Sequence, residues 1–167
     1  MRVMINDDIS KHCADFTQGI KFLKSHSLPQ ALINFRLAYD AVAYNNIYHN
    51  KYASYCGLAR VLNGDKTGVE LCRDAARQEM KDGDVYLNLA YAEWFMDSRK
   101  RSIGVLEKGL TIDSQHKGLR QLQINLGKRS TPVLSFITRD NLLNKTLGKL
   151  VHKKTPFKDD WTLQHLL

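Results

Sequence analysis

A spacing of small and aromatic residues that recurs along the chain constrains the fold more than any other feature. Counted from Gly19, the chain has Phe22 at +3, Ala31 at +12, Phe35 at +16 and Ala38 at +19. Small residues at such intervals let two helices cross closely, while the large residues between them pack. The stretch therefore predicts a pair of amphipathic helices.

The same offsets recur twice further along the chain. The second anchor is Gly57 and the third is Ala90, so the anchors lie 38 and 33 residues apart. These copies carry, in order, Arg60, Val69, Arg73 and Ala76, and then Glu93, Ser102, Leu106 and Gly109. A period of this length is typical of stacked repeat architectures.

The composition agrees with helices, since the 167 residues include only 3 Pro and 10 Gly. We expect an all-α fold, with Gly109 at a close helix crossing like Ala38 and Ala76. Gly104 has no such position, and the pattern offers no account of it. The expected helices span residues 10–24, 28–44, 50–62, 66–80, 84–96, 99–112 and 115–127.

The spacing resembles that of the tetratricopeptide repeat, a unit of 34 residues. The first unit matches the family pattern at all five positions from Gly19 to Ala38, and GLTIDS (109–114) stands where the family ends a unit. The second unit departs at Arg60 and Arg73. The resemblance implies an α-solenoid of about three helical hairpins over residues 1–127, with units at about 12–45, 50–82 and 83–116 and a capping helix at 115–127.

In this family the first helix of each unit lines an inner, concave groove that binds partners. Carried over by position, the predicted groove residues are Phe16, Ile20, Leu23, Lys51, Ser54, Leu58, Val61, Leu87, Tyr91, Trp94, Gln121 and Asn125, with Cys13 and Asp84 at the first of the four groove positions in units one and three. Because this set is mostly apolar and aromatic, we expect a hydrophobic or amphipathic partner segment. Phe16 and Ile20 replace the Lys and Asn with which some members clamp a peptide carboxylate, which disfavours that mode. The alternative is that these side chains are core, covered by the rest of the chain or by a second copy in a homodimer.

Nothing in the sequence predicts catalysis, a cofactor or a metal. Gly64-Asp65-Lys66-Thr67 lacks the Gly before Lys and the preceding strand of a phosphate-binding loop, so we expect a turn between helices. The six histidines show no ligand spacing, and we expect them at the surface. Cys13, Cys56 and Cys72 lie far apart without a CxxC pair, and we expect mostly buried, reduced thiols.

Residues 128–167 form a basic C-terminal tail, with 8 Lys/Arg against 3 Asp/Glu. The sequence of residues 141–152 predicts a short helix. The basic group of the tail comprises two lysines of this helix and the two that follow it: Lys145, Lys149, Lys153 and Lys154. The tail resembles segments that follow such repeats in bacterial proteins of unassigned function. Three interpretations remain: it folds back on the repeats, it binds an acidic partner or an anionic membrane surface, or it contacts nucleic acid.

Taken together, the sequence favours a cytoplasmic protein–protein interaction adaptor without enzymatic activity. Neither a signal peptide nor a run of 18 apolar residues is present. A secretion chaperone of the tetratricopeptide class is an alternative, because those proteins have a similar size. Those chaperones are usually acidic, whereas this chain has a net charge of +8. A nucleic-acid-associated protein acting through the basic tail is the third hypothesis.

Overall fold

The computed structural model describes residues 12–127, and throughout this range the secondary structure is α-helical, without strands. The first hairpin is α1 (Ala14–Lys24) with α2 (Leu28–Ala41), and the second is α3 (His49–Leu62) with α4 (Gly68–Gln78). The third is α5 (Gly83–Phe95) with α6 (Arg99–Ile112), and α7 (Lys117–Gly127) follows it. The all-α fold class is confirmed.

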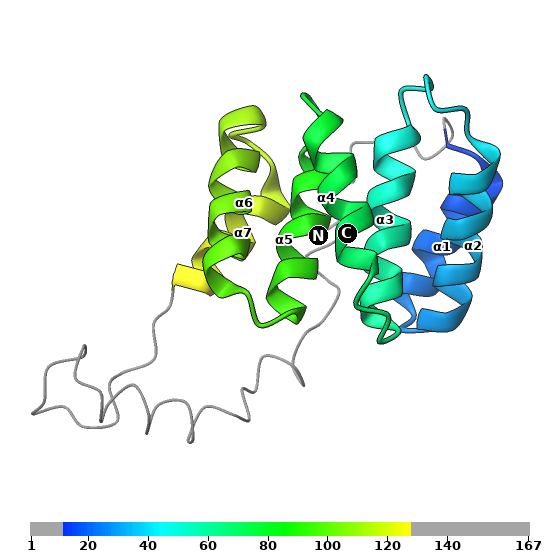
Figure 1. The fold of residues 1–167 in the computed structure, drawn as a ribbon, viewed down its shortest axis with the longest axis horizontal. Helices are drawn as coiled ribbons and strands as arrows, with labels where there is room; N and C mark the ends of the chain where they lie inside the picture. The colour runs from blue at the N-terminus through cyan, green and yellow to red at the C-terminus, as the bar shows by residue number, and fades with distance from the viewer. Residues whose placement is uncertain (1–11, 128–167) are drawn as a thin grey trace, which may run out of the picture.

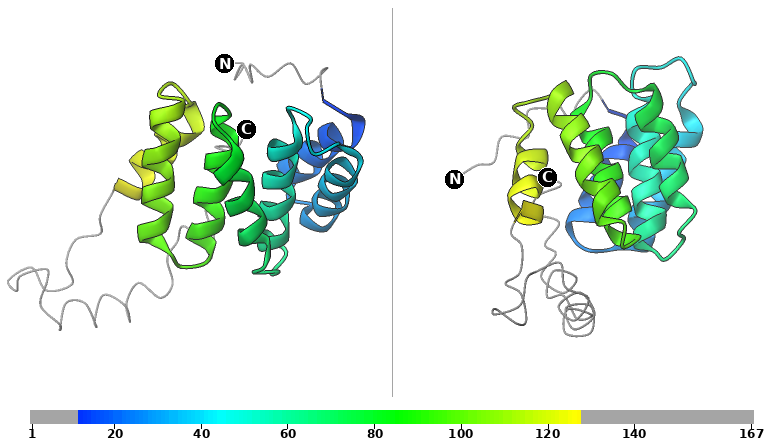
Figure 2. Two further views of the ribbon diagram at one scale, coloured as in Figure 1. Left: turned by 45° about the horizontal axis from the view of Figure 1, so that its top comes forward. Right: turned by 60° about the vertical axis from the view of Figure 1, so that its left-hand side comes forward.

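Each helix packs mainly on its neighbours in the chain, so the hairpins pile up in order, as Figures 1 and 2 show. In addition, α3 packs against α5, and α5 against α7. Helices α3, α5 and α7 therefore lie side by side along one wall of the stack, and α1 precedes them as the first helix of the first hairpin. This is the neighbour-to-neighbour contact pattern of a helical solenoid.

Small residues stand where the helices approach most closely. A Cβ atom on Gly57 of α3 would lie 2.7 Å from the carbonyl oxygen of Gly68 in α4 and 2.7 Å from Cys72 Sγ. A Cβ on Gly109 of α6 would lie 2.8 Å from Tyr86 Cβ in α5. The close crossing predicted for Gly109 is confirmed, and the absent side chain explains why a helix accepts glycine there.

The helix ends differ from the expected ones where polar side chains organise a turn. The helix expected from residue 66 begins at Gly68, because Asp65 Oδ1 accepts hydrogen bonds from the backbone N and Oγ1 of Thr67. Gly64 has a φ of 92°, so Gly64–Thr67 is the turn that was predicted. The helix expected to reach residue 44 ends at Ala41, where Val42 becomes extended.

Helices α3 and α5 form the centre of the core. Every residue of α5 from Val85 to Glu93 is buried, and so is every residue of α3 from Lys51 to Ala59. Burial of a helix around its whole circumference is typical of such a central position. In the range 12–127, no helix combines the length and the apolar character needed to cross a bilayer.

Candidate functional site

The structure places the predicted groove residues at two levels of burial. Eight of them are buried: Phe16, Leu23, Lys51, Ser54, Leu58, Val61, Leu87 and Tyr91. Four are half-buried: Ile20, Trp94, Gln121 and Asn125. Lys145, Lys149, Lys153 and Lys154 lie outside the described residues, as does the helix expected within the tail. A role of any of these residues in binding a partner stays a prediction.

Aromatic rings join the first two hairpins. The ring of Phe16 in α1 stacks on that of Tyr52 in α3 with centroids 4.5 Å apart, and it meets the ring of Tyr55 edge-on at 5.1 Å. Phe35 of α2 approaches Tyr55 from the other hairpin helix at 5.3 Å. Such ring pairs add to the stabilisation that burial of their area provides. Phe16 therefore holds α1 against α3.

An ionic cluster links the start of α3 to the start of α5. Lys51 Nζ lies 2.9 Å from Asp84 Oδ2 and 3.4 Å from Asp82 Oδ2, and His116 Nε2 lies 3.1 Å from Asp84 Oδ1. Burial alone would raise the pKa of Asp84, but the hydrogen bond from His116 and the charge of Lys51 outweigh it and lower that pKa to about 2. Burial and the neighbouring Asp84 charge raise the pKa of Asp82.

About one helical turn further along, hydrogen bonds between uncharged side chains also join α3 to α5. Asn88 Nδ2 donates to Ser54 Oγ at 3.0 Å, and Ser54 Oγ donates to the carbonyl of Lys51 at 2.8 Å. Both Ser54 and Asn88 are fully buried. Lys51 and Ser54 therefore have a structural role in joining α3 to α5.

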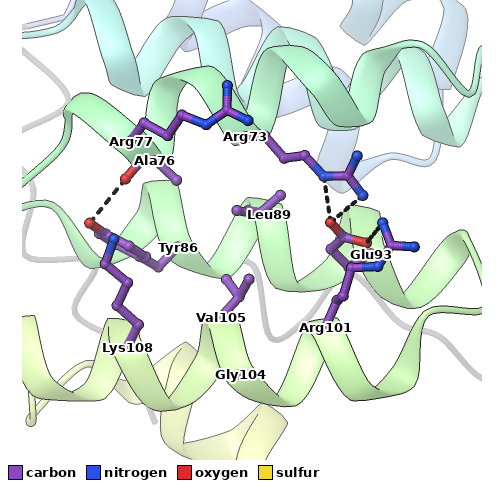
Figure 3. A pocket seen from close by; sticks show the side chains of 10 residues that line it. All are labelled: Arg73, Ala76, Arg77, Tyr86, Leu89, Glu93, Arg101, Gly104, Val105 and Lys108. Carbon is purple, nitrogen blue, oxygen red and sulfur yellow. Dashed lines mark hydrogen bonds and ion pairs between the residues drawn. The ribbon is translucent and has the colours of Figure 1, made fainter.

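A second surface feature, which the sequence did not predict, is a groove between α4 and α6 with α5 as its floor (Figure 3). Its volume is about 350 Å³. Ala76, Leu89 and Val105 contribute apolar surface, and Gly104 forms part of the α6 wall. A Cβ on Gly104 would meet no atom within 4 Å, so this glycine leaves the groove open instead of allowing a helix crossing.

Charged side chains surround this groove, and one carboxylate lies at its end. Arg73 Nη2 of α4 lies 2.6 Å from Glu93 Oε1 of α5, and Arg101 Nη1 of α6 lies 3.8 Å from Glu93 Oε2. Glu93 is only 2% exposed. The signal in the sequence was the departure from the repeat pattern at Arg73, together with the unexplained Gly104.

The cysteines and histidines lie partly as expected. Cys56 and Cys72 are buried free thiols, whereas Cys13 is exposed at the N-terminus of α1. Burial raises the pKa of Cys56 to about 11. His116 corrects the expectation of surface histidines, because it is half-buried and bonded to Asp84. Among the side chains of residues 12–127, three or more potential metal ligands do not come together.

Compared with known proteins, the chain matches no protein-family model and no curated protein.

Proposed function

We propose that the chain is a tetratricopeptide-type interaction module that binds a hydrophobic or amphipathic segment of a partner protein along the wall of odd-numbered helices. Two elements support this proposal: the repeat spacing and the neighbour-to-neighbour stacking of the hairpins. A rigid stack binds a segment without first having to order itself, which favours affinity.

The observation that carries the proposal is the position of Trp94. Trp94 lies in the last turn of α5, at a position that faces the groove in the tetratricopeptide family, and it is half-buried against the core. Ile20 is similarly half-buried near the end of α1. Tryptophan is among the residues most enriched at energetic centres of protein interfaces.

The experiment compares affinity capture from the native cell by the full-length chain and by two variants. Trp94→Ala removes the proposed anchor, while Ile33→Ala is the matched control, because Ile33 is an apolar residue of α2 that is 58% exposed. We expect Trp94→Ala to reduce recovery of the captured partner about tenfold or more. Ile33→Ala should leave the recovery unchanged.

Circular dichroism of both variants separates loss of binding from loss of folding. Equal recovery of the partner by the wild type and by a folded Trp94→Ala variant would show that the wall of odd-numbered helices is not the binding surface. If capture does depend on Trp94, mass spectrometry identifies the captured partners. Several partners would indicate a general adaptor, whereas one secreted client would indicate a chaperone.

A further inference from the structure

The groove between α4 and α6 lies on the side of the stack that the even-numbered helices form, and the proposed function does not use it. Its apolar surface comes from Leu89 on the α5 floor and from Val105, which points from the α6 wall towards Leu89 (Figure 3). Its volume of about 350 Å³ is near the lower end of the range for ligand pockets, roughly 300–1,000 Å³. This space suits one large apolar side chain.

Cations line both walls of the groove. Arg73 and Arg77 come from α4, and Arg101 and Lys108 come from α6, whereas Glu93 is the one carboxylate among the ten residues that line it. A groove with an apolar floor and cationic walls is complementary to an apolar group flanked by negative charge.

The four cations differ in how far they are already neutralised. Arg73 pairs with Glu93 and also with Glu70, at 2.5 Å, and Arg77 pairs with Asp74 at 2.5 Å. The two cations of α4 are therefore largely neutralised by carboxylates within the protein.

The cations of α6 are less satisfied. Arg101 is 63% exposed, and the carboxylate oxygen with which it pairs within residues 12–127, Glu93 Oε2, is 3.8 Å away, too far for a hydrogen bond. Lys108 Nζ lies 5.4 Å from the centre of the Tyr86 ring, and no carboxylate of residues 12–127 pairs with it. The two residues are seven positions apart, which is about 10 Å along a helix. Gly104 lies between them and leaves the wall open.

We propose that this groove binds an acidic peptide segment of a partner protein, in which one large apolar side chain is flanked by carboxylates on both sides. The apolar side chain would fill the hollow beside Gly104. The flanking carboxylates would pair with Arg101 and Lys108, and such charge-assisted hydrogen bonds are among the stronger ones at protein surfaces.

The apolar floor disfavours nucleic acid as the occupant. Tyr86 is the one aromatic side chain among the lining residues, and it is only 1% exposed. A base therefore finds no accessible ring face on which to stack. Phosphates would meet the cations but would leave the half-buried Val105 uncovered.

The test uses the full-length ¹⁵N-labelled chain and the acetylated, amidated peptide Glu-Glu-Phe-Glu-Glu in an NMR titration. Two control peptides replace either the four Glu by Gln or the Phe by Ala. We expect amide shifts centred on α4 and α6, and affinity at least about fivefold weaker for each control peptide. Equal affinity for the glutamine peptide would overturn the proposal.

Two protein variants test the groove itself. Gly104→Leu fills the hollow at a position with no neighbouring atom, so it should fold and should weaken binding about fivefold or more. The double variant Arg101→Gln, Lys108→Gln should do the same. Its matched control is Lys100→Gln, Lys117→Gln, which removes two exposed charges outside the groove and should have less than about a twofold effect.

Two further outcomes would also overturn the proposal. One is unchanged binding of the peptide to a folded Gly104→Leu variant. The other is binding that appears only after Asp159→Asn, Asp160→Asn, because Asp159-Asp160-Trp161 has the same acidic and aromatic character. That result would assign the groove to the chain's own C-terminal segment instead of a partner.

Discussion

The guanidinium of Arg73 in α4 holds the carboxylate of Glu93 in α5, with Nη2 and Oε1 2.6 Å apart and Nε donating to the same oxygen at 2.7 Å. Arg73 and Glu93 occupy the offsets at which the first unit of the repeat spacing has Phe35 and Phe22. The two departures from the spacing of the first unit therefore compensate each other, because an ion pair joins the second hairpin to the third.

Removing one partner of this pair should be more harmful than removing both. Glu93 is only 2% exposed, and Arg73→Met leaves its carboxylate without the main counter-charge. We therefore expect a loss of about 3 kcal/mol in the free energy of unfolding. The double variant Arg73→Met, Glu93→Leu should recover most of this loss, because apolar residues of similar volume often replace a buried ion pair without penalty.

Urea denaturation of the wild type, the single variants and the double variant gives the coupling energy between the two sites. A double variant that is as unstable as the sum of the single variants would show that Arg73 and Glu93 act independently.

The helical units could be predicted from the sequence because small residues at fixed intervals leave few ways to pack. The order of helices and the crossing at Gly109 follow from that pattern alone. The burial of Lys51 and Ser54 could not be predicted, since it depends on Asp84 and Asn88, which lie more than 30 positions away. The role of Gly104 could likewise not be predicted, because it depends on α4 lying across the groove, and an open groove produces no periodic pattern in the sequence.

Two glycines should respond to alanine in opposite ways. Gly57→Ala places a methyl group 2.7 Å from both Cys72 Sγ and the Gly68 carbonyl oxygen, so we expect a loss of about 1–3 kcal/mol in stability. Gly104→Ala meets nothing within 4 Å and should gain about 0.5–1 kcal/mol from helix propensity. Thermal or urea unfolding of the two variants measures both effects, and a stabilised Gly57→Ala variant would contradict the close approach of α3 and α4.

Acid should weaken the chain through Asp84. The pKa of Asp84 is about 2 in the folded protein, against an ordinary value of 3.8. The folded state therefore binds this proton less readily than the unfolded state, so the stabilisation is present above about pH 4 and is lost as the pH falls towards 2. The shift corresponds to about 2 kcal/mol. Asp84→Asn should remove this part of the acid dependence in urea midpoints measured from pH 2 to 7.

Asp82→Asn is the matched control for that measurement. Asp82 Oδ1 accepts a hydrogen bond from the backbone N of Asp84, which an amide oxygen can also accept. Because the pKa of Asp82 is raised rather than lowered, its charge opposes folding at neutral pH. The substitution should leave the loss of stability below pH 4 in place. If the Asp84→Asn variant loses as much stability below pH 4 as the wild type, Lys51 and His116 do not stabilise the charged form of Asp84.

The hydrogen bond between Ser54 and Asn88 should stabilise the contact between α3 and α5. Ser54→Ala removes the acceptor of Asn88 Nδ2 at a site where Asn88 Oδ1 already has no hydrogen-bond donor within residues 12–127. A buried amide left without partners should lower the free energy of unfolding by about 1–3 kcal/mol. Adding Asn88→Leu removes the unpaired amide and should restore part of the stability, as measured by urea unfolding. If Asn88→Leu instead makes the Ser54→Ala variant still less stable, the amide has another partner and the bond to Ser54 does not account for its burial.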